Sequence, residues 1–382
     1  MNPRHLYIHV PFCARRCVYC DFSIAVRRIT PVDEYIAALR AELSTHERGG
    51  DWNLDTVYLG GGTPSRLGAT GIAEVLDLVR EHAKIEPTAE VTIEANPEDV
   101  TLATAGAWRA AGVNRVSLGV QSFNDEVLKW MHRSHTGADA ESALRALRGA
   151  GINNVSIDLI FALPEALRRV WLDDLTRAIA LDPPHISVYG LAVEPATPLS
   201  RWVSAKSVKP LDEDPYAEEF LTADKMLSGA GYSHYEVSNY AREGMRSQHN
   251  SSYWSGAEYL GLGPSAHSLI GNERRWNVRN YAEWQTLALS GESVVAGSEI
   301  LTDELRSLES IYLGLRTSSG YHRRGTDTDR VNRWVSAGWC SVAEDVVKLN
   351  ASGWLRLDAL AADLGGTSSG RNYISSHGSS AA

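Results

Sequence analysis

The sequence predicts an α/β fold in which a parallel sheet curves into a partial, TIM-like (β/α)6 barrel, followed by a smaller C-terminal α+β domain. Short β-branched runs alternate with amphipathic helical segments about six times in the first half of the chain. Such alternation is typical of a parallel sheet covered by helices. Six units are too few to close an eight-stranded barrel, so we expect an open one.

Six runs rich in Val, Ile, Leu or Tyr are predicted to form the strands. They are Leu6–Val10, Thr56–Leu59, Glu90–Glu94, Arg115–Val120, Asn154–Ile160 and His185–Leu191. Since the crossovers should be right-handed, the carboxyl ends of these strands should meet at one mouth, where a barrel of this kind carries its chemistry.

The segments between the strands carry apolar residues near the helical period, as Tyr35, Leu39 and Leu43 do in the first of them. The predicted helices are Val32–Thr45, Ala73–Ala83, Ala103–Ala111, Ala138–Ala150 and Trp171–Leu181. Each follows a predicted strand and should cover the outside of the sheet.

The second half of the chain is less regular. Residues 211–231 and Thr302–Leu315 are helical in pattern, and Trp334–Leu360 indicates a small α+β unit. We expect a barrel over residues 1–230, a barrel-wrapping segment over 231–300 and a small C-terminal domain over 301–364. Residues 365–382 are rich in Gly and Ser and are expected to form a disordered tail.

Composition limits the function. The net charge of −10 argues against binding to a nucleic-acid backbone. No apolar run is long enough to span a membrane, and the first ten residues do not form a signal peptide, so we expect a cytoplasmic protein. In a reducing compartment, clustered cysteines indicate metal rather than disulfides.

Three of the four cysteines lie within eight residues, as Cys13-Ala-Arg-Arg-Cys17-Val-Tyr-Cys20, directly after the first predicted strand. Thiolates suit iron–sulfur clusters and zinc alike, but a structural zinc ion takes four ligands. Three cysteines can hold three irons of a [4Fe–4S] cluster and leave the fourth iron open. A zinc site whose fourth ligand lies elsewhere, or free thiols, are the alternatives.

The stretch from Tyr7-Ile-His-Val-Pro-Phe through Cys20-Asp-Phe22 resembles the start of the oxygen-independent coproporphyrinogen III oxidase branch of the radical S-adenosylmethionine (SAM) family. The resemblance covers about residues 5–360. It implies that SAM chelates the open iron, and that one electron from the cluster splits SAM into methionine and a 5′-deoxyadenosyl radical. The protein would bind and orient the cofactor.

The resemblance also implies a SAM site at the strand ends. Gly60-Gly-Gly-Thr-Pro64 follows the second strand, where glycines let the backbone approach a ligand. One departure is Ala162, where relatives usually have Gly before Leu-Pro. Taken singly, each candidate is more often an ordinary polar residue or a structural ion pair. The implied cofactor contacts are Tyr7, Tyr19, Gly61, Gly62, Thr63, Glu94, Gln121, Arg133, Asp158, Ala192 and His267.

Three features separate the oxidases of this branch from its heme chaperones. Phe22 stands where the oxidases have a further cysteine, and the cluster motif begins at residue 13, without the oxidases' N-terminal extension. The chaperones' HNxxYW motif is complete as His249-Asn250-Ser-Ser-Tyr253-Trp254. A histidine can ligate heme iron, and aromatic rings offer flat faces to a porphyrin. A packed structural loop is the alternative for this motif.

The resemblance therefore implies a heme chaperone that binds heme, SAM and a [4Fe–4S] cluster and delivers heme to client hemoproteins, which include membrane respiratory enzymes as candidates. An electron donor and a homodimer are further expected partners. The alternative functions are oxidative decarboxylation of coproporphyrinogen III, and another radical SAM reaction such as methyl transfer. In the chaperone, coproporphyrinogen dehydrogenase activity is expected to be lacking, and no catalytic residue is assigned.

Overall fold

The computed structural model describes residues 2–46 and 51–365. Contacts divide the chain into two compact units, one made of Met1–Asp212 and Glu258–Glu299, the other of Glu213–Ala257 and Ile300–Ala382. The expected wrapping segment 231–300 is thus divided between the two units. The physical reason is that residues 258–299 extend the barrel sheet rather than forming a layer of their own.

The six predicted strands form the centre of the first unit's sheet. They are β1 (His5–Val10), β4 (Asn53–Gly61), β5 (Lys84–Ala95), β6 (Arg115–Gln121), β7 (Asn154–Phe161) and β8 (His185–Gly190). They lie in this order and every neighbouring pair is parallel. Their carboxyl ends therefore share one edge, where His9 of β1 is in register with Gly60 of β4.

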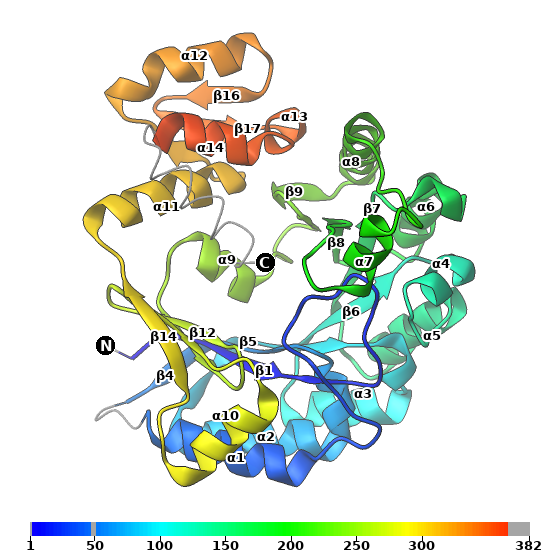
Figure 1. Ribbon diagram of the computed structural model, residues 1–382, viewed down its shortest axis with the longest axis vertical. Helices are drawn as coiled ribbons and strands as arrows, with labels where there is room; N and C mark the ends of the chain where they lie inside the picture. The colour runs from blue at the N-terminus through cyan, green and yellow to red at the C-terminus, as the bar shows by residue number, and fades with distance from the viewer. Residues whose placement is uncertain (1, 47–50, 366–382) are drawn as a thin grey trace. The chain divides into compact units, whose positions relative to one another are not determined.

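The predicted helices connect these strands as α1 (Val32–Ser44), α2 (Gly68–His82), α3 (Leu102–Ala111), α5 (Gly137–Gly149) and α6 (Trp171–Ala180). Capping boxes at Thr101 and Thr136 begin α3 and α5. Helices α1, α2 and α3 lie side by side along the outside of the sheet (Figure 1). Two short helices, α4 (Asp125–Trp130) and α7 (Pro198–Ser204), were not predicted, because six or seven residues show too little periodicity.

A seventh parallel strand, β11 (Tyr259–Leu262), pairs with β1 on the side away from β4. The sheet continues through β12 (His267–Ile270), β13 (Glu273–Asn277) and β14 (Val295–Ile300), and α10 (Tyr281–Ser290) packs against α1 (Figure 1). The sequence did not predict β11, since four residues interrupted by Gly261 carry little strand signal.

The second unit contains α8 (Glu213–Gly229), α11 (Asp303–Arg316) and the hairpin of β9 (Ser233–Glu236) with β10 (Asn239–Ala241). Its C-terminal part is the expected α+β unit. There β17 (Val346–Leu349) pairs antiparallel with β15 (Tyr321–His322) and β16 (Cys340–Ala343), accompanied by α12 (Thr328–Ser336), α13 (Ala351–Trp354) and α14 (Leu357–Gly365). The expected tail lies outside the described residues except for Gly365, which ends α14. Within the described residues, no helix has the length and apolarity that a membrane crossing requires.

Candidate functional site

The three clustered cysteines lie at the mouth of the barrel. The loop that follows β1 carries Cys13, Cys17 and Cys20, all partly exposed. Cys13 belongs to β2 (Phe12–Cys13), and its Sγ lies 3.4 Å from the hydroxyl of Thr63, which follows β4. The Cys20 N–H donates to the Cys17 carbonyl at 3.3 Å. Cys13 therefore stands beside the glycine-rich turn.

Two opposing features surround the thiols: burial, which disfavours the thiolate, and a nearby cation, which favours it. Burial raises the pKa of Cys13 and raises that of Cys20 to about 12, so these two thiols stay protonated near neutral pH in the metal-free protein. Arg133 brings its guanidinium within 3.8 Å of Cys17 Sγ, and it is held there by bonds to Asn96 Oδ1 (2.6 Å) and the Gly119 carbonyl (2.8 Å). A fixed cation beside a cysteine favours the thiolate that iron requires.

No three His, Cys, Asp or Glu side chains of residues 2–46 and 51–365 converge on one metal position. Convergence of three side chains on one position is the geometry of a site for a single metal ion. The thiolates of a [4Fe–4S] cluster each bind a different iron and need not converge. The donor set of three partly exposed cysteines on one loop, beside Arg133, therefore fits a cluster that keeps one iron free of protein ligands.

The glycine-rich turn is fixed by a partly buried carboxylate. The Gly61 N–H donates to Glu94 Oε2 at 2.9 Å, and the Tyr58 hydroxyl donates to Glu94 Oε1 at 2.9 Å. Gly61 has a φ of +105°, and a Cβ at this position would collide with the His9 ring. Glycine is required here both for the backbone conformation and for the space beside His9.

Replacing Gly61 by Ala is expected to destabilise the metal-free protein by roughly 2–5 kcal/mol, since it combines left-handed strain with overpacking. Gly68→Ala is the matched control, because Gly68 has a φ of +71° and open space around it. The control should cost only about 1–2 kcal/mol. Urea denaturation of the metal-free proteins measures both. Equal losses for the two variants would show that the space beside His9 has no importance.

Two partly buried carboxyl groups, those of Glu94 and Asp158, lie between the turn and the inside of the barrel. Burial raises the pKa of Glu94 to about 7, and the nearby Asp158 acts in the same direction. Asp158 accepts hydrogen bonds from the hydroxyls of Ser117 (2.9 Å) and Ser156 (3.1 Å), while burial raises its pKa. Together with Arg133, these groups can bind the ammonium and carboxylate of a zwitterionic ligand.

The remaining predicted cofactor contacts of this unit differ in their surroundings. The Tyr7 hydroxyl lies 3.1 Å from His9 Nδ1, and Tyr19 packs beside the buried apolar cluster that includes Met131. Gln121 ends β6 with a φ of +66°. His267, in β12, stacks on the Trp276 ring at 6.0 Å. Ala192 is exposed two residues beyond the end of β8, whose last residue is Gly190 rather than the predicted Leu191.

The departure at Ala162 has a backbone cost. Ala162 follows β7 with a φ of +58°, in the left-handed region that glycine adopts freely. The glycine that the family resemblance implies before Leu-Pro would suit this conformation, and alanine bears a strain of roughly 1–2 kcal/mol.

Three residues that support the site were not among the predicted contacts. Asn96 holds Arg133, Tyr58 holds Glu94, and His9 fills the space beside Gly61 and bonds the Ser23 carbonyl through Nε2 at 2.9 Å. His9 and Tyr58 are polar or aromatic residues inside buried strands. That position was the only signal for them in the sequence.

The HNxxYW motif forms α9 (Gln248–Trp254) in the second unit, and not a loop. His249 is 1% exposed, and its Nε2 lies 2.9 Å from the Tyr253 hydroxyl. The Trp254 ring lies 4.2 Å beneath the guanidinium of Arg316, which pairs with the buried Glu236 at 3.0 Å. Asn250 donates its backbone N–H to Ser247 Oγ at 3.3 Å. Heme ligation by His249 stays a prediction.

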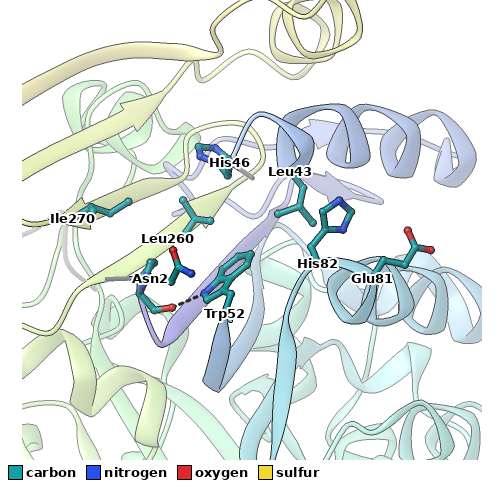
Figure 2. Close-up of a pocket in the computed structure, with 9 residues that line it drawn as sticks. Asn2, Leu43, His46, Trp52, Glu81, His82, Leu260 and Ile270 are labelled. Atoms are coloured by element: carbon teal, nitrogen blue, oxygen red, sulfur yellow. Dashed lines mark hydrogen bonds between the residues drawn. The ribbon is translucent and has the colours of Figure 1, made fainter. Parts of the chain in front are cut away.

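A pocket of about 260 Å³ lies at the amino ends of the first unit's parallel strands, opposite the carboxyl ends where the cysteines lie (Figure 2). Leu43, Trp52 and Leu260 are among its lining residues, and the Trp52 Nε1–H donates to the Pro3 carbonyl at 2.6 Å. None of the predicted site residues lines it. The pocket is therefore separate from the cysteine site.

The chain is similar to known proteins in sequence and in fold. Residues 7–171 match the Radical SAM superfamily. The heme chaperone HemW of Mycobacterium tuberculosis is 37% identical over 371 residues, covering 94% of this chain and 94% of that protein. The heme chaperone HemW of Synechocystis sp. is 38% identical over 329 residues, covering 84% and 79%. The structure of coproporphyrinogen III oxidase HemN from Escherichia coli superposes with a TM-score of 0.78 at 22% identity, covering 94% of this chain and 90% of that one, a likeness that shows the fold.

Proposed function

This chain belongs to the heme chaperone HemW family within the radical SAM superfamily, and from that premise we propose that it binds heme and transfers it to client hemoproteins. The observation that carries the proposal is the complete HNxxYW motif, together with identity to HemW proteins along nearly the whole chain. Three cysteines in the family's pattern support a [4Fe–4S] cluster, and the polar strand ends support SAM.

Heme binding through the motif would require a local rearrangement. An axial ligand needs a free ring nitrogen, and His249 Nε2 faces the Tyr253 hydroxyl in a nearly inaccessible position. Breaking this bond and turning the His249 ring outward would free the nitrogen for iron. Tyr253 and Trp254 are partly exposed on the same helix and would then offer ring faces to the porphyrin.

A heme titration followed by the Soret band tests this proposal. With the anaerobically reconstituted wild type, we expect saturable binding. His249→Ala should shift the band and weaken binding at least tenfold, while Tyr253→Phe should strengthen binding by about 0.5–1.5 kcal/mol, because it removes the bond that competes for Nε2.

His322→Ala is the control, because His322 is an exposed histidine of the same unit. An unchanged Soret band in His249→Ala would remove His249 as the ligand. Absence of saturable heme binding in the wild type would contradict the chaperone function itself. Measured consumption of coproporphyrinogen III, with release of CO2, would favour the oxidase instead.

At the barrel mouth, a bound cluster with SAM would supply reductive cleavage of the sulfonium when an electron is available. Cys13, Cys17 and Cys20 would hold the cluster, and Arg133 would stabilise its negative charge. Glu94 would hold the turn at Gly61 against the ligand, and Asp158 would contribute charge deeper in the barrel. In a chaperone we propose that these groups serve binding, dimerisation and heme release more than turnover.

A further inference from the structure

The segment that follows the cysteine loop is both apolar and basic on its exposed side. Phe22, Val26 and Ile29 are 50%, 46% and 82% exposed. Arg27 and Arg28 are exposed between them. Residues 11–30 contain four arginines and one acidic residue, Asp21, a formal charge of +3 in a chain of −10. The basic-apolar patch consists of Phe22, Val26, Arg27, Arg28 and Ile29.

Backbone hydrogen bonds fix this patch to the loop that carries the cysteines. Val26 is the parallel partner of Cys13 in the short β2–β3 pair, where β3 is Ala25–Val26. The Arg27 N–H donates to the Cys13 carbonyl at 3.0 Å. Arg66 donates to the carbonyls of Arg27 and Arg28, both at 3.1 Å, and adds a further cation. A partner that covers the patch is therefore brought next to the first cysteine.

We propose that the basic-apolar patch docks an acidic one-electron carrier protein that reduces the cluster. The inference rests on the proposed function, because it requires the cluster on Cys13, Cys17 and Cys20. In the step, the reduced centre of the carrier loses one electron and the cluster gains that electron. No bond forms or breaks and no proton moves.

Charge and position favour this partner over two others. A second copy of the chain would bring the same net positive charge of the patch against itself in a two-fold interface, which is unfavourable. An anionic membrane could also attract arginines and apolar side chains, but it gives no reason for their attachment to Cys13. An acidic carrier suits both the charge and the position. Asp33 and Glu34, exposed at the start of α1, follow the patch closely in the sequence and would orient the carrier by repulsion.

The test uses the full chain, anaerobically reconstituted, with its iron and sulfide content measured first. The probe is an acidic plant-type [2Fe–2S] ferredoxin, whose affinity is measured by calorimetry at low and high salt and whose rate of cluster reduction is measured by stopped flow. The test variant is Arg27→Glu/Arg28→Glu, and Phe22→Ser/Ile29→Ser removes apolar contact. Arg109→Glu/Arg145→Glu makes the same charge change on the exposed faces of α3 and α5.

We expect wild-type affinity to fall with salt, and Arg27→Glu/Arg28→Glu to weaken ferredoxin binding and slow reduction by at least tenfold. The apolar variant should weaken binding several-fold, and the control variant should match the wild type. Reduction by dithionite should be the same in all four proteins, which would show that the cluster is intact.

Three results would overturn the proposal. The first is that the wild type binds no ferredoxin, and the second is that the patch and control variants bind ferredoxin equally well. The third is that Arg27→Glu/Arg28→Glu loses only the binding of anionic vesicles or only self-association. Heme titrations of the same proteins separate this outcome from failure of the chaperone function. A chain that binds heme but not ferredoxin contradicts the docking surface alone.

Discussion

Replacing Cys17 by Ala is expected to abolish the iron–sulfur cluster. The bound iron and sulfide of the reconstituted protein should fall to near zero, and the broad absorption near 400 nm should disappear. The reason is that the loop offers three thiols, and a cluster that already keeps one iron free of protein ligands would then have only two anchors. Cys17 is also the thiol that Arg133 approaches, so its loss leaves that guanidinium without its sulfur partner.

Cys340→Ala is the matched control for this loss. Cys340 is a 7%-exposed residue of β16 in the other unit, and burial raises its pKa. Its replacement should leave the iron content unchanged. Full iron and sulfide content in Cys17→Ala would mean that the loop does not hold the cluster. A stoichiometry of one zinc in the wild type and in Cys340→Ala, lost in Cys17→Ala, would favour the zinc alternative.

The barrel could be predicted because its strands and helices carry local patterns. The six central strands are β-branched runs between helices of regular period, and all six lie where the sequence places them. The extension of the sheet could not be predicted this way. Tyr259–Leu262 has no alternation, and its place beside β1 is set by long-range contacts, among them the bonds from Gly263 and Asn277 to Glu42.

In the candidate site, too, local patterns could be predicted from the sequence and long-range contacts could not. Cys13, Thr63 and Glu94 were predictable because each stands at the carboxyl end of a parallel strand or just beyond it, and parallel strands bring these ends together. The role of Asn96 was not predictable, since its partner Arg133 lies 37 residues away. The burial of His249 could not be predicted either, because the motif does not determine whether its histidine faces solvent or Tyr253.

Replacing Glu42 by Ala is expected to lower the free energy of unfolding by about 3–5 kcal/mol. Glu42, on α1, is 1% exposed, and its carboxylate accepts three hydrogen bonds from the extension of the sheet. The donors are the Gly263 N–H at 2.8 Å, the Asn277 side-chain amide at 2.6 Å and the Trp284 indole N–H at 2.9 Å. Alanine would leave all three donors buried without this acceptor. Glu34→Ala, at an exposed position of the same helix, should change stability by less than about 0.5 kcal/mol.

The same carboxyl group predicts a pH dependence. Burial raises the pKa of Glu42 to about 7, against a value of 4.5 for the exposed group, although its three donors act in the opposite direction. Between these two pH values the folded protein binds more protons at Glu42 than the unfolded chain does, so stability falls as the pH rises through 7. The difference in unfolding free energy between the wild type and Glu42→Gln, which cannot titrate, should decrease by roughly 2.5 kcal/mol from pH 5 to pH 8. Urea denaturation of the metal-free proteins at both pH values measures this difference. A constant difference would mean that the three donors overcome burial and keep Glu42 ionised, so that this contact acts as a fixed charge and not as a titrating one.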